Sequence, residues 1–222
     1  MQKSGPEGQV PVDFPEGVHK LASTRGAYAY LVEGRDPDGG PGSPRLSVLI
    51  DTGFPGRAAR ILVELESLGV KHLDHIVVTH GDVDHTGNLE RMMRETGARA
   101  WIPAGERPYI MGVKPRPGIK RLVGALVRVA VPDSVDDLSD GDRVGPLEAL
   151  ATPGHTPGHL AFRGLGFLAV GDALTVRNGR MVPSSGLMAW NAQLARESAE
   201  HLLAGFHGWI LPAHGEPARF DG

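Results

Sequence analysis

The sequence predicts an α/β layered fold, because short apolar runs alternate with helix-like segments along its 222 residues. Hydrophobic residues make up 41% of the chain, which is enough for a packed core. The 31 glycines and 18 prolines favour many turns and short strands over long helices. No low-complexity tract or linker divides the sequence. We therefore expect one domain over residues 1–222, with residues 1–18 as a loosely ordered N-terminal extension.

The first half of the chain is expected to hold five strands and two helices. The strands are predicted at 19–22, 27–33, 46–50, 76–78 and 99–102, with a turn-rich loop over 35–45. Apolar residues at 58, 61, 62, 65 and 68 have helical spacing, which predicts a helix over 55–68 that stops at Gly69. A second helix is predicted over 86–95, with Leu89, Met92 and Met93 on one face.

The second half continues the alternation of strands and helices. Strands are predicted near 142–144, 148–151, 160–162, 167–170 and 209–211. Helices are predicted over 119–129 and 192–203. Both halves contain strands that lead directly into polar residues.

Five apolar runs are followed by a tight turn or a small residue and then by a residue able to bind a metal. These segments are 48–51, 76–85, 150–155, 167–172 and 209–214. The richest of them, 76–85, places His80, Asp82, Asp84 and His85 within six residues. A solvated acidic loop is the alternative for this cluster alone, but the recurring pattern weakens that alternative. The sequence therefore predicts a metal site built from loops on a rigid sheet.

The backbone of residues 80–85 decides how many metals this segment can serve. In an extended chain the side chains at 80, 82 and 84 fall on one side, and His85 points toward a second position. A helix would align 80 with 84 and rotate 82 away, so an irregular turn at Gly81 is the better interpretation. One short loop can then serve two neighbouring metals.

The composition limits which residue types could bind a metal and which classes of partner the protein could bind. The chain has no cysteine, so a metal must be held by histidines and carboxylates. A net charge of -3 gives no electrostatic footprint for nucleic acid or an acidic membrane surface. No apolar run approaches the roughly 18 residues of a membrane span, and the N-terminus lacks a signal-peptide stretch. We expect a cytoplasmic protein with a small-molecule substrate, and a homodimer is one option for its oligomeric state.

The segment 79–87 (Thr-His-Gly-Asp-Val-Asp-His-Thr-Gly) resembles the signature loop of the metallo-β-lactamase superfamily, which usually reads H-x-H-x-D-H. The later Gly154-His155, Gly171-Asp172 and Ala213-His214-Gly215 are similar to its further metal motifs, in the same order. Asp51-Thr52-Gly53 resembles its early strand-end Asp. The likeness runs from about residue 19 to 216. It implies a four-layer αββα sandwich with the site at one edge, between two sheets.

The resemblance also implies a role for each candidate ligand. His80, Asp82 and His155 would hold a first metal, Asp84, His85 and His214 a second, Asp172 would bridge them, and Asp51 would orient the ligand loop. Asp82 departs from the family, which usually has His there, and a carboxylate is a charged and harder donor than imidazole. We expect two divalent ions, zinc first, with iron or manganese as alternatives because of Asp82.

A metal-dependent hydrolase is the expected function. Two divalent ions about 3.5–4 Å apart lower the pKa of a bridging water and polarise a carbonyl, which provides a metal-bound hydroxide as nucleophile. Asp84 would orient that water and pass a proton to the leaving group. The expected substrate is a small ester, lactone or thioester. Tyr109, Met111, Met188 and Trp190 are candidates for the substrate pocket, although they could also be ordinary core residues.

Three other functions stay open. Asp82 suggests a diiron protein of the same fold that handles oxygen or transfers electrons, and such a protein would need a redox partner. A phosphodiesterase or nuclease of this fold would be expected to show a basic surface, which the charge does not indicate. A non-catalytic binding module is disfavoured by the retained ligand positions. Two further segments are ambiguous: His159 is expected either near the ligands or in a strand-start hydrogen bond, and residues 184–186 are expected to form a turn.

Overall fold

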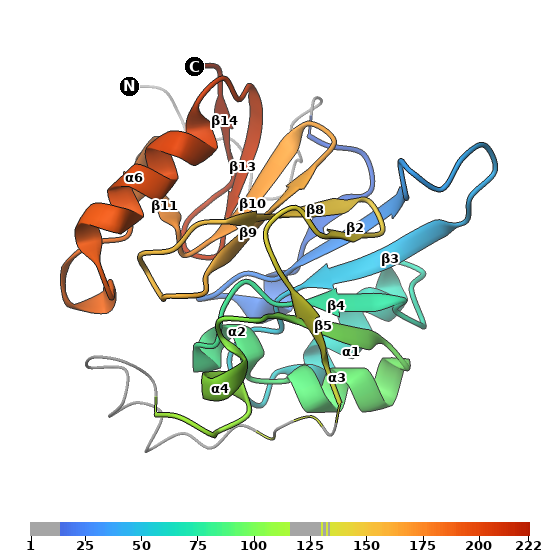
Figure 1. Cartoon of the computed structure of the whole chain (residues 1–222). Coiled ribbons are helices and arrows are strands. Elements are labelled where there is room, and N and C mark those ends of the chain that lie inside the picture. Colours follow the sequence, from blue (N-terminus) through green and yellow to red (C-terminus); the bar gives the residue numbers. More distant parts are fainter. Residues whose placement is uncertain (1–13, 116–129, 131, 133) are drawn as a thin grey trace, which may run out of the picture.

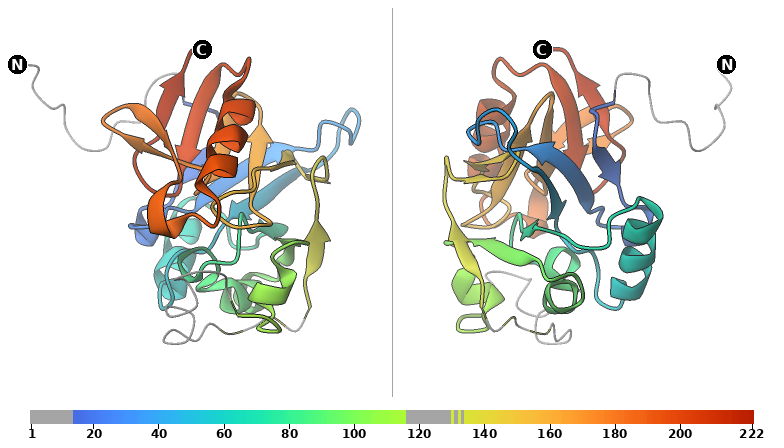
Figure 2. Two further views of the ribbon diagram at one scale, coloured as in Figure 1. Left: turned by 60° about the vertical axis from the view of Figure 1, so that its left-hand side comes forward. Right: turned by 90° about the vertical axis from the view of Figure 1, so that its right-hand side faces the viewer.

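The computed structural model describes residues 14–115, 130, 132 and 134–222. These residues form two six-stranded sheets that pack face to face, together with a two-stranded ribbon (Figure 1). Helices α1 (Ala58–Ser67) and α3 (Leu89–Thr96) cover the outer face of the first sheet, and α6 (Ala192–Leu203) covers the second (Figure 2). The layers run helix, sheet, sheet, helix, which confirms the expected α/β sandwich.

The first sheet keeps its strands in sequence order. They are β1 (Val18–Lys20), β2 (Tyr30–Arg35), β3 (Arg45–Ile50), β4 (His75–Val77), β5 (Arg99–Pro103) and β6 (Asp136–Leu138). The strands from β3 to β6 pair in parallel, and β1 to β3 pair antiparallel. Parallel strands are covered on both faces, which is why the run 76–78 is apolar throughout and fully buried.

The second sheet is built from the C-terminal half. Its order is β14 (Ala218–Phe220), β13 (Gly208–Pro212), β10 (Phe167–Gly171), β9 (Leu160–Gly164), β8 (Leu147–Ala151) and β7 (Arg143–Val144). β10 and β13 are parallel neighbours, so their carboxyl ends lie together. The other pairs are antiparallel. This arrangement brings the residues after β10 and β13 to the same edge.

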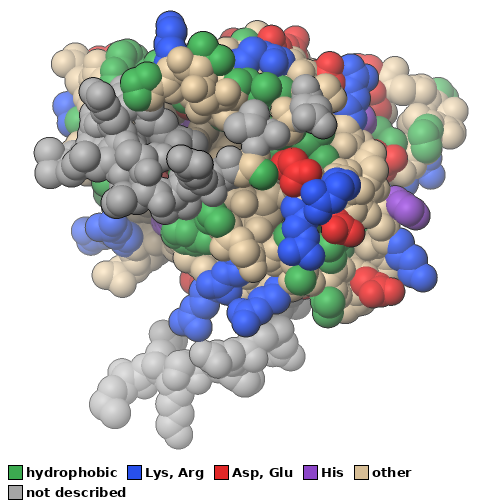
Figure 3. All heavy atoms as spheres, turned by 90° about the horizontal axis from the view of Figure 1, so that it is seen from below, with side chains coloured by type: hydrophobic (Ala, Val, Ile, Leu, Met, Phe, Trp, Pro, Cys, Tyr) green, Lys and Arg blue, Asp and Glu red, His purple; other side chains and the backbone are tan. Residues whose placement is uncertain are grey.

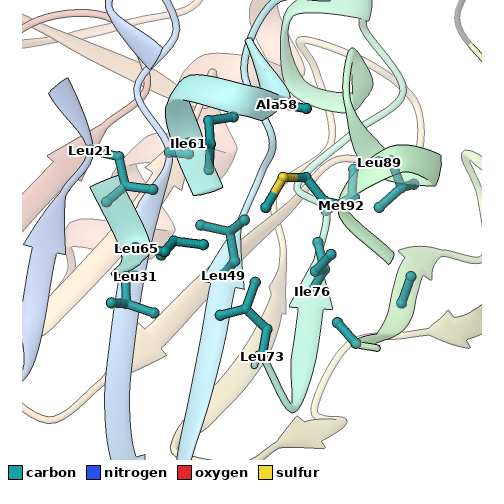
Figure 4. Close-up of a cluster of buried hydrophobic side chains, with 14 of the residues drawn as sticks. Leu21, Leu31, Leu49, Ala58, Ile61, Leu65, Leu73, Ile76, Leu89 and Met92 are labelled. Atoms are coloured by element: carbon teal, nitrogen blue, oxygen red, sulfur yellow. The ribbon is translucent and has the colours of Figure 1, made fainter. Parts of the chain in front are cut away.

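Alternating side chains of the strands divide the core into layers. On β3, Leu49 faces α1 and α3 together with Ile61, Ile76 and Met92 (Figure 4). Its neighbours Val48 and Ile50 face the second sheet instead. A third layer packs α6 against the outside of β10 and β13. Because successive side chains of a strand point to opposite faces, each apolar run supplies core residues to both faces of its sheet.

The surface seen in Figure 3 carries basic, acidic and apolar side chains close to one another. On the exposed side of α3, Arg94 pairs with Glu90 at 2.6 Å and Arg91 pairs with Glu95 at 3.7 Å, both at the i,i+4 spacing of a helix. Such pairs contribute a few tenths of a kcal/mol each, about 0.2–0.5. Within the described residues, no helix is long and apolar enough to span a membrane.

The predicted helix over 86–95 is wrong in its bounds. The structure has a one-turn helix α2 (Val83–Thr86), then a break at Gly87, then α3. A Cβ on Gly87 would lie 2.4 Å from the nitrogen of Pro55, so the break allows two loops to touch. The expected extended alternation of residues 80, 82 and 84 is also wrong beyond Asp82, because Asp84 and His85 are helical.

Several short elements were absent from the sequence interpretation. They are β6, β14, the helix α4 (Arg107–Ile110) and the ribbon of β11 (Leu174–Arg177) and β12 (Arg180–Pro183). The ribbon turns at Asn178 and Gly179, both with positive φ (50° and 72°), and Asn-Gly is a strong hairpin signal that the interpretation overlooked. The predicted helix over 119–129 lies outside the described residues.

The start of the chain differs in part from the expected loose extension over 1–18. Residues 1–13 lie outside the described residues. Phe14 is ordered against the core, with its ring 5.0 Å from that of Trp209. Val18 is a buried strand residue of β1. Ordered packing therefore begins several residues earlier than expected.

Candidate metal centre

Side chains from both sheets converge at one edge of the sandwich in two groups. Their candidate ligand atoms are within 4.8 Å of one another in each group, which are His80, His155 and Asp172, and Asp84, His85 and His214. The first sheet supplies the segment after β4, and the second sheet supplies the residues after β8, β10 and β13. The predicted strand ends thus bring together the residues that the sequence marked as ligands.

The carboxylate of Asp82 lies beside the histidines of the first group. Its Oδ2 lies 3.3 Å from Nε2 of His80 and 3.2 Å from Nε2 of His155. Asp82 is the N-cap residue of α2, and its extended backbone (φ -71°, ψ 151°) directs the side chain toward the loop of His155. Nε2 of His155 also lies 3.1 Å from Oδ2 of Asp172. Asp82 therefore lies close to both imidazoles, and its direct ligation of a metal stays a prediction.

The second group gathers around the other oxygen of Asp172. Oδ1 of Asp172 lies 3.4 Å from Nε2 of His85 and 3.3 Å from Nε2 of His214. Oδ2 of Asp84 is 3.8 Å from Nε2 of His85 and 3.5 Å from Nε2 of His214. Asp172 thus presents one oxygen to His155 of the first group and the other to the histidines of the second group.

These separations fit two metal ions. Ligands that bind one ion at about 2.0–2.2 Å with tetrahedral angles are themselves about 3.3–3.6 Å apart. Three buried atoms in the cluster have no hydrogen-bond partner among the described residues: Nε2 of His80, Nε2 of His85 and Oδ1 of Asp172. Buried polar atoms are almost always paired, so three that point to one place need an external partner. A divalent cation at each group would satisfy all three.

Asp51 organises the histidines of both groups. Its Oδ2 accepts a hydrogen bond from Nδ1 of His85 at 2.8 Å and from Oγ1 of Thr79 at 2.9 Å. Thr79 Oγ1 in turn lies 3.0 Å from Nδ1 of His80. A proton on each Nδ1 leaves each Nε2 free to ligate. Asp51 also accepts from the backbone N–H of Thr79 (2.8 Å), and its φ of 61° places it in the left-handed region.

His155 is held by a residue that the sequence interpretation assigned to a turn. Oγ of Ser184 lies 2.7 Å from Nδ1 of His155. The backbone N–H of Trp190 donates to the carbonyl of His155 at 3.0 Å. The segment after β12 therefore supports the first group from the side of the second sheet. No motif marks Ser184, because it is 29 residues from the ligand that it holds.

His159 is buried beside the ligands without joining either group. Its Nδ1 pairs with Oγ1 of Thr152 at 2.8 Å, and its Nε2 accepts from the backbone N–H of Asp172 at 3.1 Å. Burial first, and then the neighbouring His80 and His155, lower the pKa of His159 well below 6.5, which keeps it neutral. It therefore holds the backbone of Asp172 close to the candidate ligands and also makes a hydrogen bond at the start of β9, so both alternatives considered for it apply.

Opposite charges set the protonation of the second group. The nearby carboxylates of Asp172 and Asp84 raise the pKa of His214 to about 10. Burial lowers the pKa of His85, but the carboxylates of Asp51 and Asp172 outweigh it, and the pKa rises well above 6.5. Burial likewise opposes ionisation of Asp84 and Asp172, yet the charge of His85 outweighs it and lowers both pKa values. The carboxylates are therefore ionised at neutral pH.

The cluster opens on the side of the second group. The side chains of His80 and His85 are fully buried, whereas Asp84 is 20% exposed and His214 is 33% exposed. Solvent therefore reaches the cluster from the side of Asp84 and His214. The candidate ligands therefore differ in exposure, since His80 and His85 are buried and Asp84 and His214 face solvent.

None of the four residues predicted for the substrate pocket belongs to the buried core. Tyr109 and Met111 are half-buried on α4 and just after it. Met188 and Trp190 are about half exposed, at 53% and 51%. Of these four residues, Trp190 is hydrogen-bonded to the segment that carries His155, through its backbone N–H. Their role in substrate binding stays a prediction.

A family model for the metallo-beta-lactamase superfamily matches residues 24–214. The uncharacterized protein YobT of Bacillus subtilis is 31% identical over 196 residues, which cover 77% of this chain and 82% of YobT. “Probable metallo-hydrolase YflN” of the same organism is 32% identical over 185 residues, 75% of this chain and 67% of YflN. The hydroxyacylglutathione hydrolase of Rhodospirillum rubrum is 32% identical over 204 residues, 88% of this chain and 67% of that enzyme.

Solved structures share the fold at lower identity. The B3 metallo-beta-lactamase BLEG-1 has a TM-score of 0.67 at 19% identity, with 91% of this chain and 93% of that chain covered. TTHA1623, solved in a di-iron-bound form, has a TM-score of 0.67 at 23% identity, with 87% and 89% covered. Both structures therefore share the sandwich fold of this chain.

Proposed function

The chain belongs to the metallo-beta-lactamase superfamily, whose members are mostly metal-dependent hydrolases, and on that premise we propose that it hydrolyses a small thioester or a related ester or lactone. The observation that carries the proposal is the place of Asp172 between the two groups of candidate ligands, with one oxygen toward each. A thioester comes first because the relative that covers 88% of this chain is named a hydroxyacylglutathione hydrolase.

The donor set suits two divalent ions. His80, Asp82 and His155 would hold the first, Asp84, His85 and His214 the second, with Asp172 shared. Zinc is the first candidate for both. The third carboxylate, Asp82, adds a negative and harder donor, which makes iron or manganese a stronger competitor at the first position than a second imidazole would.

When bound, two such ions would lower the pKa of water and would polarise a carbonyl group. Asp84 is ionised and faces the open side of the cluster, so its carboxylate can accept a proton there and return it to the leaving group. His80 and His85 are fully buried and held through Nδ1, so they anchor the site and take no part in proton transfer. A thiolate leaves readily once the carbonyl has been attacked, because it is a weak base.

The half-exposed apolar side chains of Met188 and Trp190 lie on a segment that is hydrogen-bonded to the His155 loop. We propose that they contact the part of the substrate next to the carbonyl. Aromatic and thioether side chains offer adaptable apolar surface for such a group. This assignment is tested by Trp190→Ala, which should raise KM and leave kcat largely unchanged.

The test of the function is thiol release from a 2-hydroxyacyl thioester of glutathione, measured beside simple esters, lactones and a β-lactam. The metal-loaded protein should hydrolyse the thioester, and His85→Ala should lose at least about 100-fold in kcat/KM, since even outer-shell residues of metal sites cost 10–100-fold. His201→Ala, which removes an exposed histidine of α6, is the matched control. If the metal-loaded protein hydrolyses no compound of the panel faster than His85→Ala does, the proposal is refuted.

A second candidate function rests on Asp82. A carboxylate 3.2–3.3 Å from both histidines of the first group would suit an iron pair that exchanges electrons with oxygen. The discriminating measurement is elemental analysis of protein purified without added metal, followed by oxygen consumption with a chemical reductant. Iron with reductant-dependent oxygen uptake would favour this candidate. Zinc alone, or iron without oxygen uptake, would count against it.

A further inference from the structure

We propose that Glu106 is a positioning residue that ties together the two chain segments supplying the first metal position. The inference rests on the proposed dinuclear site and goes beyond it, since Glu106 contacts none of the ligand side chains in the described structure. It predicts that one buried carboxylate controls metal occupancy at the first position and leaves the second largely unaffected.

Glu106 uses its two oxygens on two different loops. Oε2 accepts a hydrogen bond from the backbone N–H of Gly81 at 3.1 Å, and Oε1 accepts one from the backbone N–H of Gly158 at 2.8 Å. Glu106 is only 1% exposed, so these hydrogen bonds are shielded from water. A carboxylate is well suited to this place, because it accepts at both oxygens and donates at neither.

The two loops are those of the first ligand group. Gly81 lies between His80 and Asp82, and Gly158 closes the loop that carries His155. The ligands particular to the second group are placed differently, since Asp84 and His85 lie on α2 and His214 follows β13. Movement at Gly81 or Gly158 would therefore displace first-group ligands most directly.

The backbones of Gly105 and Gly158 beside Glu106 are packed so closely that only glycine fits at these two positions. A Cβ on Gly158 would lie 2.7 Å from the carbonyl carbon of Gly105, and a Cβ on Gly105 would lie 2.9 Å from Cα of Gly158. A Cβ on Gly81 would meet Oε2 of Glu106 and Cγ1 of Ile110, each at 3.0 Å. This close approach brings both N–H groups within reach of one short side chain.

The backbone that carries the Glu106 side chain is itself held at the end of a strand of the first sheet. Glu106 is the N-cap residue of α4, and its own N–H donates to the carbonyl of Pro103 on β5. The next residue, Arg107, donates from Nε to Oδ1 of Asp137 at 2.6 Å. The carboxylate therefore links a rigid strand end of one sheet to the His155 loop of the other. That makes it a positioning device between the two halves of the sandwich.

A second glutamate that also accepts two backbone hydrogen bonds provides a control. It separates a general effect on folding from an effect on the position of the metal ligands. Glu64 on α1 also accepts from two backbone N–H groups, those of Ala22 and Ser23, both at 2.8 Å. It touches neither ligand loop. Glutamine at either position keeps one acceptor and turns an NH2 group toward the other N–H, so each variant loses one carboxylate–amide hydrogen bond. Glu64→Gln is therefore the matched control for Glu106→Gln.

The experiment measures Zn²⁺ affinity by competition with a chromophoric chelator, in backgrounds that isolate each position. In His214→Ala, which weakens the second position, adding Glu106→Gln should reduce the remaining affinity about 10–100-fold. In His80→Ala, which weakens the first, adding Glu106→Gln should change it by less than about threefold. Adding Glu64→Gln should have no such effect in either background, whereas circular dichroism melts should fall in both glutamine variants.

Several results would overturn the inference. Equal losses in the two backgrounds, or unchanged affinity in both, would show that Glu106 does not select the first position. If Glu106→Gln does not fold while Glu64→Gln does, Glu106→Asp, which keeps the charge and loses a methylene of reach, takes its place in the same comparison. If neither Glu106→Gln nor Glu106→Asp folds, Glu106 is required for folding only, and the inference is refuted. A wild-type protein that binds no Zn²⁺ would instead refute the dinuclear site itself.

Discussion

Oδ2 of Asp82 lies 3.2 Å from Nε2 of His155, although 73 residues separate them in the sequence. In most relatives the position of Asp82 is expected to hold a histidine. The contact therefore brings an anionic oxygen to the proposed first metal position. It changes the charge and the hardness of that position without changing its place in the fold.

Replacing that oxygen should shift metal selectivity. We predict that Asp82→His raises the affinity for Zn²⁺ relative to Mn²⁺ by at least about tenfold, because an imidazole replaces a hard, charged donor. Asp82→Asn keeps an oxygen donor and removes the charge, so it should lower the affinity for both ions. Competition titrations of the three proteins provide the measurement. An unchanged Zn²⁺ to Mn²⁺ ratio in Asp82→His would mean that Asp82 does not ligate.

Metal binding at the second position should release protons. The pKa of His214 is raised to about 10 and that of His85 well above 6.5, so both imidazoles carry a proton at pH 7. A ligating imidazole must be neutral, so about two protons leave on binding. The apparent affinity should fall as the pH falls below these pKa values, by up to about 100-fold per pH unit. Calorimetry in buffers of different ionisation enthalpy counts the protons.

Ser184 should matter through His155 alone. We predict that Ser184→Ala weakens Zn²⁺ binding about 10-fold, because the Nδ1 partner that orients the His155 ring is lost. Ser185→Ala changes the adjacent, exposed hydroxyl and is the matched control. Equal affinity in the two variants would contradict the assigned role of Ser184. The comparison also tests whether the segment after β12 belongs to the site.

The sequence indicated which candidate ligands the fold would bring together, but it did not indicate the residues that support them. The apolar runs before Asp51, His155, Asp172 and His214 end as predicted, because parallel and neighbouring strands deliver their last residues to one edge. Glu106 and Ser184 carry no such signal. Each acts on a loop far away along the chain, and only the closed fold makes the contact. Helix α2 escaped prediction because one turn is too short to show a helical period.

Asp51 should affect both metal positions, unlike Glu106. It accepts from His85 directly and reaches His80 through Thr79. We predict that Asp51→Asn lowers Zn²⁺ affinity about 10–100-fold at each position, because an NH2 group then faces a donor. Asp74→Asn is the control, since Asp74 accepts in a similar way from the N–H and Oγ of Ser47, away from the ligands. A loss confined to one position would contradict this branching arrangement.

The central claim is that Asp172 bridges two metal ions held by His80, Asp82, His155, Asp84, His85 and His214. Its most direct test is a crystal structure of the protein as purified, with anomalous difference maps on both sides of the zinc, iron and manganese absorption edges. We expect two peaks, one against each oxygen of Asp172. A single peak, or peaks that leave either group of ligands without a metal, would contradict the account.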